Sequence, residues 1–324
     1  MSTFDHGWTP EQRALKQSAI EFSRREVLPH LDQWEKEGEL PRELQKKLAH
    51  AGLLGVGVAE EVGGDGGTLL DICALQEGLM EAGWSGGALA SAYTHGIAIP
   101  HIIQNGSPEL IDTWVRPTLA GDLIGSMAVT EPGTGSDVAN ISTRAVRDGD
   151  HWVINGTKNW ITNGGTADYY LVIAQTHKEK KHKGINAFIV EKGWEGFEIG
   201  PKEDKLGIRG SDTHSLIFND VKVPKENRIG EDGFGFKFAM KTLAGGRIGI
   251  ASQALGIASG AYELALKYSK ERKAFGTEIC NHQAIAFKLA DMAVSIEAAR
   301  HLCLKAAWDK DNLNNYDLSG AMAK

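Results

Sequence analysis

Residues 126–137 read SMAVTEPGTGSD, an apolar run followed by a turn rich in hydroxyls, glycines and carboxylates. Such a turn suits ligand binding, because glycines let the backbone approach a ligand closely and hydroxyls can bond the ring edge or phosphate of a polar cofactor. The residues concerned are Gly133, Gly135, Thr130, Thr134 and Ser136. Gly- and Ser-rich turns are also common between strands, so an ordinary polar hairpin explains this segment equally well when it is taken alone.

A second segment, residues 151–164, places a planar aromatic two residues from a hydroxyl. Its apolar start predicts a strand, Asn155-Gly156 predicts a tight hairpin turn, and residues 158–162 predict the returning strand. On that strand Trp160 and Thr162 point to the same face, which suits one flat, heteroatom-rich ring system. A lone Trp in a strand is more often part of the core, and that alternative stays open here.

The elements that must position these segments change type twice along the chain. Up to residue 121 the apolar spacing is helical, and Thr9-Pro10-Glu11-Gln12 has the residues of a capping box with proline in the first turn. From residue 123 to about 228 the spacing becomes two, as in strands. After Gly233 the helical spacing returns. The helices predicted after the first cover residues 41–51, 69–82, 88–103, 107–121, 236–270 and 282–310, and residues 318–324 look like the start of another.

These changes predict an α+β fold of three domains. Residues 1–122 form an N-terminal helical domain, residues 123–230 a central β barrel or sandwich, and residues 231–324 a C-terminal helical bundle. The bundle is predicted to be incomplete, because the last helix has barely begun where this sequence stops. Apolar faces of the two long helices are therefore expected to be uncovered, which favours self-association or poor solubility.

The composition is that of an ordinary globular chain and excludes some partners. With 35 basic and 42 acidic residues the net charge is −7, so nothing attracts the chain electrostatically to nucleic acid or to anionic membranes. Cys73, Cys280 and Cys303 have no metal-type spacing and are expected to be free thiols in a reducing compartment. The N-terminal residues resemble neither a signal peptide nor a transit peptide, so a cytoplasmic location and no membrane span are expected.

Four motifs together resemble one family, the acyl-CoA dehydrogenases. They are TEPGTGSD at residues 130–137, NGTKNWITN at 155–163, KEDKLGIRGS at 202–211 and ERKAFG at 271–276, in the order and rough spacing of that family. Any one motif is moderately specific, whereas four in register are highly specific. The resemblance extends from about residue 4 to the end of the sequence, and GRIGIASQALG at residues 246–256 looks most like the short-chain and bacterial members.

The resemblance implies an FAD-dependent oxidoreductase. Acyl-CoA dehydrogenases convert a saturated acyl-CoA thioester to a trans-2-enoyl-CoA and pass the electrons to an electron-transfer flavoprotein, as in fatty acid β-oxidation. It also implies a homo-oligomer, a tetramer built as a dimer of dimers. The length or branching of the acyl chain does not follow, because pocket depth depends on side chains whose mutual positions a sequence does not give.

The resemblance also assigns site residues. Two segments of the β domain are expected to line or cover the flavin: Met127, Val129, Thr130, Gly135, Ser136, Trp160 and Thr162. Residues near the start of the last long helix match those that reach the FAD of a partner subunit: Arg272, Phe275, His282 and Gln283. Ser136 is also expected to border the acyl-CoA, with Arg247 near its pantetheine or nucleotide part. Met127 replaces a common aromatic, and Ala244 an acidic residue found in many relatives.

No catalytic base is recognisable in this sequence. Most family members carry a catalytic glutamate in a loop beyond a Gln-x-x-Gly-Gly segment, and neither feature occurs here. Other members carry the glutamate immediately before an arginine that matches Arg247, and that position is Gly246. Two hypotheses follow: an acyl-CoA dehydrogenase in C-terminally shortened form, or a non-catalytic FAD- or acyl-CoA-binding subunit that depends on a partner chain.

Overall fold

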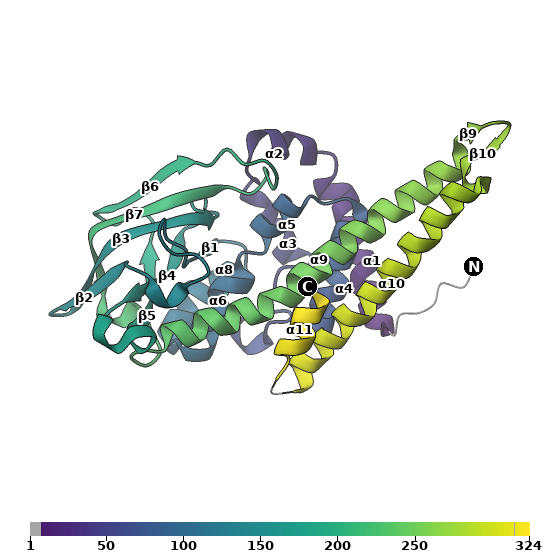
Figure 1. Cartoon of the computed structure of the whole chain (residues 1–324). Helices are drawn as coiled ribbons and strands as arrows, with labels where there is room; N and C mark the ends of the chain where they lie inside the picture. The colour runs from purple at the N-terminus through teal and green to yellow at the C-terminus, as the bar shows by residue number, and fades with distance from the viewer. Residues whose placement is uncertain (1–7, 314) are drawn as a thin grey trace. The chain divides into compact units, whose positions relative to one another are not determined.

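A computed structural model describes residues 8–313 and 315–324, which fall into two compact units (Figure 1). Of the described residues, one unit consists of those up to Leu31, Gly67–Gly86 and those from Ala244 onward, and the other of Asp32–Gly66 and Gly87–Leu243. The predicted α+β class is confirmed, since a helical stretch, a β region and long helices follow one another along the chain. The two units are defined by which residues contact one another in space, and each combines segments that are distant in sequence. The predicted domain boundaries at residues 122 and 230 therefore stay a prediction.

The second unit contains a sheet and the short helices that cover one of its faces. Its helices are α2 (Leu31–Glu37), α3 (Glu43–His50), α5 (Gly86–Ala92), α6 (His95–Asn105), α7 (Pro108–Leu110) and α8 (Arg116–Leu119), with short helical segments η2 (Glu60–Val62) and η3 (Ile111–Val115). The prediction of one helix over residues 88–103 was wrong, because the chain breaks between α5 and α6. The Ser91 carbonyl there accepts from the Thr94 hydroxyl and the Asn163 amide, so side chains take the oxygen that would continue the helix.

Eight strands of the described residues form one sheet in the order β6-β7-β3-β2-β4-β5-β8, with β1 paired to β4. The strands are β1 (Gly125–Ala128), β2 (Arg144–Asp148), β3 (His151–Thr162), β4 (Tyr169–Gln175), β5 (Ile185–Glu191), β6 (Phe197–Lys202), β7 (Thr213–Pro224) and β8 (Arg228–Ile229). Short helical segments between them are η4 (Val138–Asn140), η5 (Lys178–Gly184) and η6 (Lys225–Asn227). The period-two pattern predicted this region, and its strands confirm it.

Strand β4 is buried along its whole length and separates two cores. Tyr169, Leu171 and Ile173 pack with helical residues such as Trp114 on one face. The alternate residues of β4 pack with Phe188, Phe218 and other strand residues on the opposite face. Because successive side chains of a strand point to opposite faces, the alternation fixes the register of β4 and with it the position of β1, which pairs with it in parallel.

The predicted hairpin at Asn155-Gly156 was wrong, because β3 is one continuous strand from His151 to Thr162. The tight turn lies earlier, where Asp148 pairs with His151 and Gly149 has φ 56°. Gly156 instead permits close packing, since a Cβ there would lie 2.6 Å from the Thr143 hydroxyl oxygen. The Asn155 side chain bonds both the backbone and the carboxylate of Asp220, where the register shifts opposite β3. Asn155 and Gly156 therefore stabilise an irregular, continuous strand and not a hairpin turn.

The first unit is helical. It contains α1 (Pro10–Phe22), η1 (Ser23–Val27), α4 (Leu69–Ala82), most of α9 (Gly235–Glu271), the two-stranded β9 (Lys273–Ala274) and β10 (Thr277–Glu278), η7 (Ile279–Asn281), α10 (Gln283–Asn312) and α11 (Asp317–Ala323). The predicted capping box of α1 is confirmed: the Thr9 hydroxyl accepts from the Gln12 backbone, and the Gln12 side chain accepts from the Thr9 backbone.

Small residues let α9 approach α4 closely in this unit. A Cβ at Gly256 would lie 2.6 Å from Cβ of Met80, so a larger residue would push the two helices apart. The core there joins Leu69 and Cys73 of α4 with Ile248 of α9 and Cys303 of α10. No helix of the described ranges is long and apolar enough to cross a membrane.

Candidate functional site

The ends of β1 and β3 lie side by side and bring together most of the predicted flavin residues. The Ser126 hydroxyl donates to the Thr162 carbonyl at 2.6 Å, and four residues further along the Asn159 amide donates to the Thr130 carbonyl at 2.8 Å. Met127 and Val129 lie between these two bonds, opposite the segment that carries Trp160. The two motifs found in the sequence thus meet in space, which sequence spacing alone did not show.

A buried ion pair lies beneath this meeting point. Lys158 of β3 is fully buried, and its Nζ lies 2.8 Å from Oε1 of Glu131 and 2.9 Å from the Val129 carbonyl oxygen. Burial by itself would raise the pKa of Glu131, but the Lys158 ammonium and hydrogen bonds from Lys158, Ser142 and Thr143 lower it to about 2. Burial lowers the pKa of Lys158 to about 8. Both groups are therefore mainly charged at neutral pH.

Trp160 stands in an irregular stretch of β3. Lys158 pairs with Leu216 and Ile161 with His214, so two residues of β3 oppose the single residue between these partners. Trp160 has φ 60°, which is unusual for a large side chain, and its residue surface is 58% exposed. Such bulges re-aim side chains beside binding sites. Trp160 and Thr162 were predicted to share a face because side chains alternate along a regular strand. The bulge interrupts this alternation, and the shared face stays a prediction.

The turn after β1 is open where a ligand would approach. Nothing lies within 4 Å of a Cβ built at Gly133 or Gly135, and Gly135 and Ser136 are exposed. The hydroxyls of Thr130, Ser136 and Thr162 make no hydrogen bond to any residue that the structure describes. Together these features give an accessible backbone, three available hydroxyls and one exposed indole ring.

The remaining predicted cofactor residues gather in the helical unit, at the turn between α9 and α10. Phe275 is at the tip of the β9–β10 hairpin, with φ 53° and a fully exposed side chain. His282, the residue before α10, holds the hairpin through a 3.0 Å hydrogen bond between its Nε2 and the Ala274 carbonyl oxygen. Arg272 and Gln283 are exposed beside it, and Arg272 forms no ion pair with a described residue. A cation and an aromatic ring are thus exposed on one hydrogen-bonded hairpin.

Arg247 is on α9 with an exposed side chain, and Gly246 precedes it. Nothing lies within 4 Å of a Cβ at Gly246, so a side chain would fit there. Arg247 belongs to the helical unit and Ser136 to the sheet unit, so each is described only within its own unit.

Sequence reasoning missed two residues that support the site. Lys158 and Asn163 belong to the second motif but were not selected, and both are buried. A lysine followed by apolar Trp160 and Ile161 in a predicted strand, together with Glu131 in the first motif, was the available signal for a buried pair. Asn163 gave no such signal, because its partners Ser91 and Thr94 are in a helical region far away in sequence.

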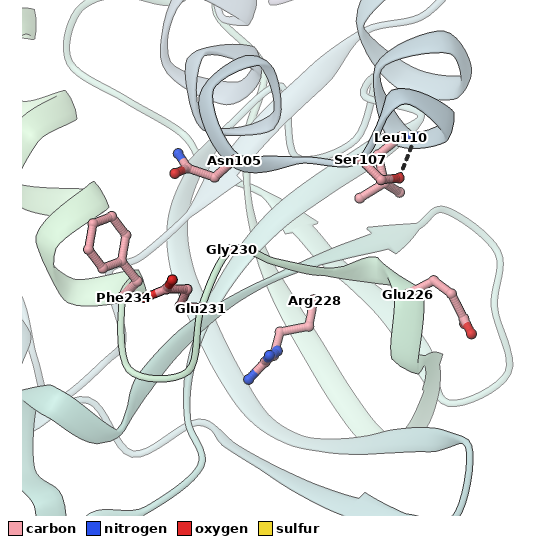
Figure 2. Close-up of a pocket in the computed structure, with 8 residues that line it drawn as sticks. All are labelled: Asn105, Ser107, Leu110, Glu226, Arg228, Gly230, Glu231 and Phe234. Atoms are coloured by element: carbon pink, nitrogen blue, oxygen red, sulfur yellow. Dashed lines mark hydrogen bonds between the residues drawn. The ribbon is translucent and has the colours of Figure 1, made fainter.

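A separate hollow of about 560 Å³ opens between the α6–α7 connection and β8 in the sheet unit (Figure 2). Its described lining residues are Asn105, Ser107, Leu110, Glu226, Arg228, Gly230, Glu231 and Phe234. None of the predicted site residues is among them. The only hydrogen bond drawn within it joins the Leu110 amide to the Ser107 hydroxyl, a helix cap. The hollow is therefore distinct from the meeting point of β1 and β3.

The residues present fit the FAD predicted from the motifs. An open, glycine-containing turn suits close backbone approach, and unpaired hydroxyls suit the hydrogen-bonding edge of a flavin or its ribityl chain. An exposed indole on a strained, fixed strand suits a planar ring, and exposed Arg272 suits a phosphate. Large exposed aromatics and unusual backbone angles cluster at binding sites, and both occur here in Trp160.

Known proteins match the chain along nearly all its length. Three protein-family models match the chain. They are described as the N-terminal, middle and C-terminal domains of acyl-CoA dehydrogenase and match residues 9–122, 126–221 and 233–324, respectively. A short-chain specific acyl-CoA dehydrogenase of Clostridium acetobutylicum is 44% identical over 99% of this chain and 84% of its own length.

Two solved structures extend the comparison. Butyryl-CoA dehydrogenase from Megasphaera elsdenii is 40% identical, with a TM-score of 0.92 over 99% of this chain and 84% of its own. The FAD complex of PigA is 27% identical, with a TM-score of 0.92 over 99% of this chain and 84% of its own. These relatives favour the enzyme hypothesis over the non-catalytic subunit. The chain belongs to the acyl-CoA dehydrogenase family, and its cofactor is FAD.

Proposed function

We propose that this acyl-CoA dehydrogenase acts on short-chain acyl-CoA thioesters. The reaction removes a proton from the α carbon and a hydride from the β carbon, giving a trans-2-enoyl-CoA, and the electrons pass to an electron-transfer flavoprotein. When bound, FAD supplies the acceptor for the hydride. The preference for short chains is supported by the relatives named for short-chain and butyryl substrates.

The site residues of the sheet unit are assigned to the flavin. Thr130 and Thr162 present hydroxyls to its polar edge, Trp160 covers its ring, and Ser136 borders both the ribityl chain and the acyl-CoA. Met127 and Val129 supply the apolar surface between them. The observation that carries this assignment is the exposed ring of Trp160, whose backbone φ is 60°. The strand that carries Trp160 is hydrogen-bonded through the Asn159 amide to the Thr130 carbonyl oxygen.

The turn between α9 and α10 is assigned to the phosphate and adenine end of FAD. Arg272 pairs with phosphate oxygens, Phe275 packs on a ring, and His282 and Gln283 present polar atoms. Arg247 binds the pantetheine or nucleotide part of the acyl-CoA. The support is the exposure of these side chains on a fixed hairpin, together with the ERKAFG motif.

The group that removes the α proton is left unassigned. That C–H is a weak acid, so its removal needs a carboxylate and a hydrogen-bonded thioester oxygen on which negative charge can develop. Gly246 offers no carboxylate at the position used by some relatives. The residues assigned above therefore bind and orient the cofactor and the substrate, and none of them takes the proton.

A homo-oligomer, a dimer of dimers, is part of the proposal. Large apolar side chains are exposed on α9 at Ile250, Ile257 and Leu264 and on α10 at Phe287 and Val294. The seven-residue spacing on α9 forms one stripe, and contiguous apolar surface of this kind marks an association face. The proposed location is the cytoplasm, supported by three free cysteines.

The test uses purified protein and its visible spectrum. A flavin band should co-purify, and anaerobic addition of butyryl-CoA should bleach it more completely than octanoyl- or palmitoyl-CoA. Bleaching only by the long substrates would overturn the chain-length proposal. Bound flavin with no bleaching by any acyl-CoA would contradict the activity for this chain, and absence of flavin after reconstitution with excess FAD would contradict the site assignment. Light scattering during size-exclusion chromatography tests the oligomer.

A further inference from the structure

Lys158 is a fully buried lysine in the middle of a sheet, which is an uncommon place for an ammonium group. Removing a charge from water is costly unless close partners compensate for the lost hydration. Two partners are present within the same unit: the Glu131 carboxylate at 2.8 Å and the Val129 carbonyl oxygen at 2.9 Å. The lysine therefore bonds two residues of the turn that follows β1.

The next residue of β3 adds a third bond to the same turn. The Asn159 amide donates to the Thr130 carbonyl oxygen at 2.8 Å, so Val129, Thr130 and Glu131 are each held by Lys158 or Asn159. The bulge frees the Asn159 amide for this bond, because the ladder to β7 skips Asn159 and Trp160. The backbone on either side of the Thr130 hydroxyl is thus fixed to the strand that carries Trp160.

Glu131 is also held from the other side. Its Oε2 accepts from the Ser142 amide at 2.6 Å and from the Ser142 hydroxyl at 2.7 Å, and its Oε1 accepts from the Thr143 amide at 2.9 Å. One carboxylate thereby closes the loop of residues 131–143 onto β3. These hydrogen bonds are directional, and an apolar pair of the same volume would make none of them.

A buried ion pair contributes little to stability compared with well-packed apolar residues. Replacement of such pairs by apolar groups is often neutral or stabilising, so stability does not account for Lys158 and Glu131. Trp160, two residues after Lys158, is held at φ 60°, and unusual backbone angles persist only where the surroundings determine them. A positioning role accounts for both observations.

We propose that the buried Lys158–Glu131 pair positions the Thr130 turn against the Trp160 ring, and so sets the affinity and orientation with which the flavin of FAD is held. The proposal rests on the assignment of Thr130 and Trp160 to the flavin given above. Lys158 and Glu131 are both buried, and neither is assigned to the flavin or to the acyl-CoA. They act through the backbone of the turn.

Three variants separate positioning from stability. Lys158→Met and Glu131→Gln each remove one partner, and the double variant Lys158→Met/Glu131→Leu removes both charges while keeping apolar volume. Val223→Ala is the matched control, because it deletes buried volume on β7 opposite Trp152, at the far end of β3 from Trp160. The four proteins are compared for thermal midpoint, FAD dissociation constant and flavin absorption. Hydrogen exchange of peptides covering residues 126–137 and 155–163 is measured without cofactor.

The expected result is a separation of two readouts. The double variant leaves no unpaired buried charge, so its thermal midpoint should lie above that of Lys158→Met, although the Ser142 and Thr143 amides lose their acceptor. It should nevertheless hold FAD about tenfold more weakly than wild type, show absorption bands nearer those of free flavin and exchange faster in both peptides. Val223→Ala should lose thermal midpoint with near wild-type FAD affinity, absorption and exchange in residues 126–137.

Two results would overturn the proposal. One is a double variant with wild-type affinity and spectrum. The other is that Val223→Ala, with a thermal midpoint as low as that of Lys158→Met, loses as much FAD affinity. The pair would then have a merely structural role. If wild type itself fails to bind FAD while its peptides are protected, the site assignment fails. If Trp160→Ala and Thr130→Val bind FAD normally while Lys158→Met does not, the assignment of Trp160 and Thr130 to the flavin fails. The Lys158–Glu131 pair would still influence FAD binding.

Discussion

Ser91 and Asn163 are joined by two hydrogen bonds between distant parts of the sheet unit. The Ser91 hydroxyl donates to Oδ1 of Asn163 at 2.6 Å, and Nδ2 of Asn163 donates to the Ser91 carbonyl oxygen at 2.9 Å. Asn163 is buried, has φ 55° and follows directly after Thr162. The break between α5 and α6 is thereby tied to the end of the strand that carries the proposed flavin residues.

Substitution of Asn163 should reveal both its bonds and its backbone angle. Asn163→Gly tolerates the positive φ but loses the bonds, which should lower the free energy of unfolding by about 1–3 kcal/mol. Asn163→Ala should lose about 1 kcal/mol more, because a Cβ disfavours that angle. Urea unfolding followed by circular dichroism measures both, with exposed Asn140→Ala as the control. An alanine variant as stable as the glycine variant would contradict the role given to the angle.

Gly135 should matter to the ligand and hardly at all to folding. Open space surrounds a Cβ at this position, and its φ is not positive, so Gly135→Leu is accommodated in the free chain. The added side chain would occupy the space that the proposal assigns to FAD, so FAD affinity should fall at least about tenfold. Gly207→Leu is the matched control, because Gly207 is equally open but belongs to another loop. Equal FAD binding by the two variants in a fluorescence titration would remove Gly135 from the site.

The sequence predicted the order of helices and strands well, because the period of apolar residues reports which face of an element is buried. The helix over residues 69–82 is found at those bounds as α4, and the apolar run of residues 170–174 lies in β4. Local chemistry alone was misleading at Asn155-Gly156. Those residues suit a hairpin turn, yet the packing of Gly156 against Thr143 and of Asn155 against Asp220 keeps the strand continuous.

The candidate site was predicted only as far as its motifs extend. The motifs named Thr130 and Trp160, which the proposal assigns to the flavin, but not the buried Lys158 that joins their two segments. A contact between residues 131 and 158 depends on the pairing of β1, β3 and β4, which a single sequence does not specify. The backbone angle of Trp160 likewise arises from a register shift between β3 and β7.

Stability should fall in acid through Glu131. Its ordinary pKa of 4.5 is lowered in the folded chain to about 2, where burial opposes ionisation but the Lys158 charge and the hydrogen bonds prevail. Between pH 4.5 and 2 the unfolded chain binds more protons, so the free energy of unfolding should decrease by about 3 kcal/mol as the pH falls through this window. The loss should be complete only below the folded pKa.

Urea midpoints measured between pH 5 and pH 2.5 check the greater part of this window. Glu131→Gln should be less stable than wild type at pH 5, since it leaves Lys158 buried without its counter-charge, but its profile should be flatter as the pH falls. Val223→Ala is destabilised by lost apolar volume and should keep the wild-type slope. An equally steep profile in Glu131→Gln would show that other carboxylates cause the acid effect.

Thiol reactivity should distinguish one cysteine from the other two. Cys73 and Cys303 are 2% and 1% exposed and adjoin each other in the core of the helical unit, whereas Cys280 is partly exposed. The hydrogen bond with Cys303 and burial raise the pKa of Cys73, and only the thiolate reacts with a disulfide reagent. The same hydrogen bond lowers the pKa of Cys303, so Cys303 is protected by its burial. Ellman's reagent at pH 8 should therefore label one thiol quickly in the native chain and three in 6 M guanidinium. Cys280→Ser should abolish the fast phase. Rapid labelling of a second thiol in that variant would mean that the packing of α4 against α10 opens far more readily than its burial implies.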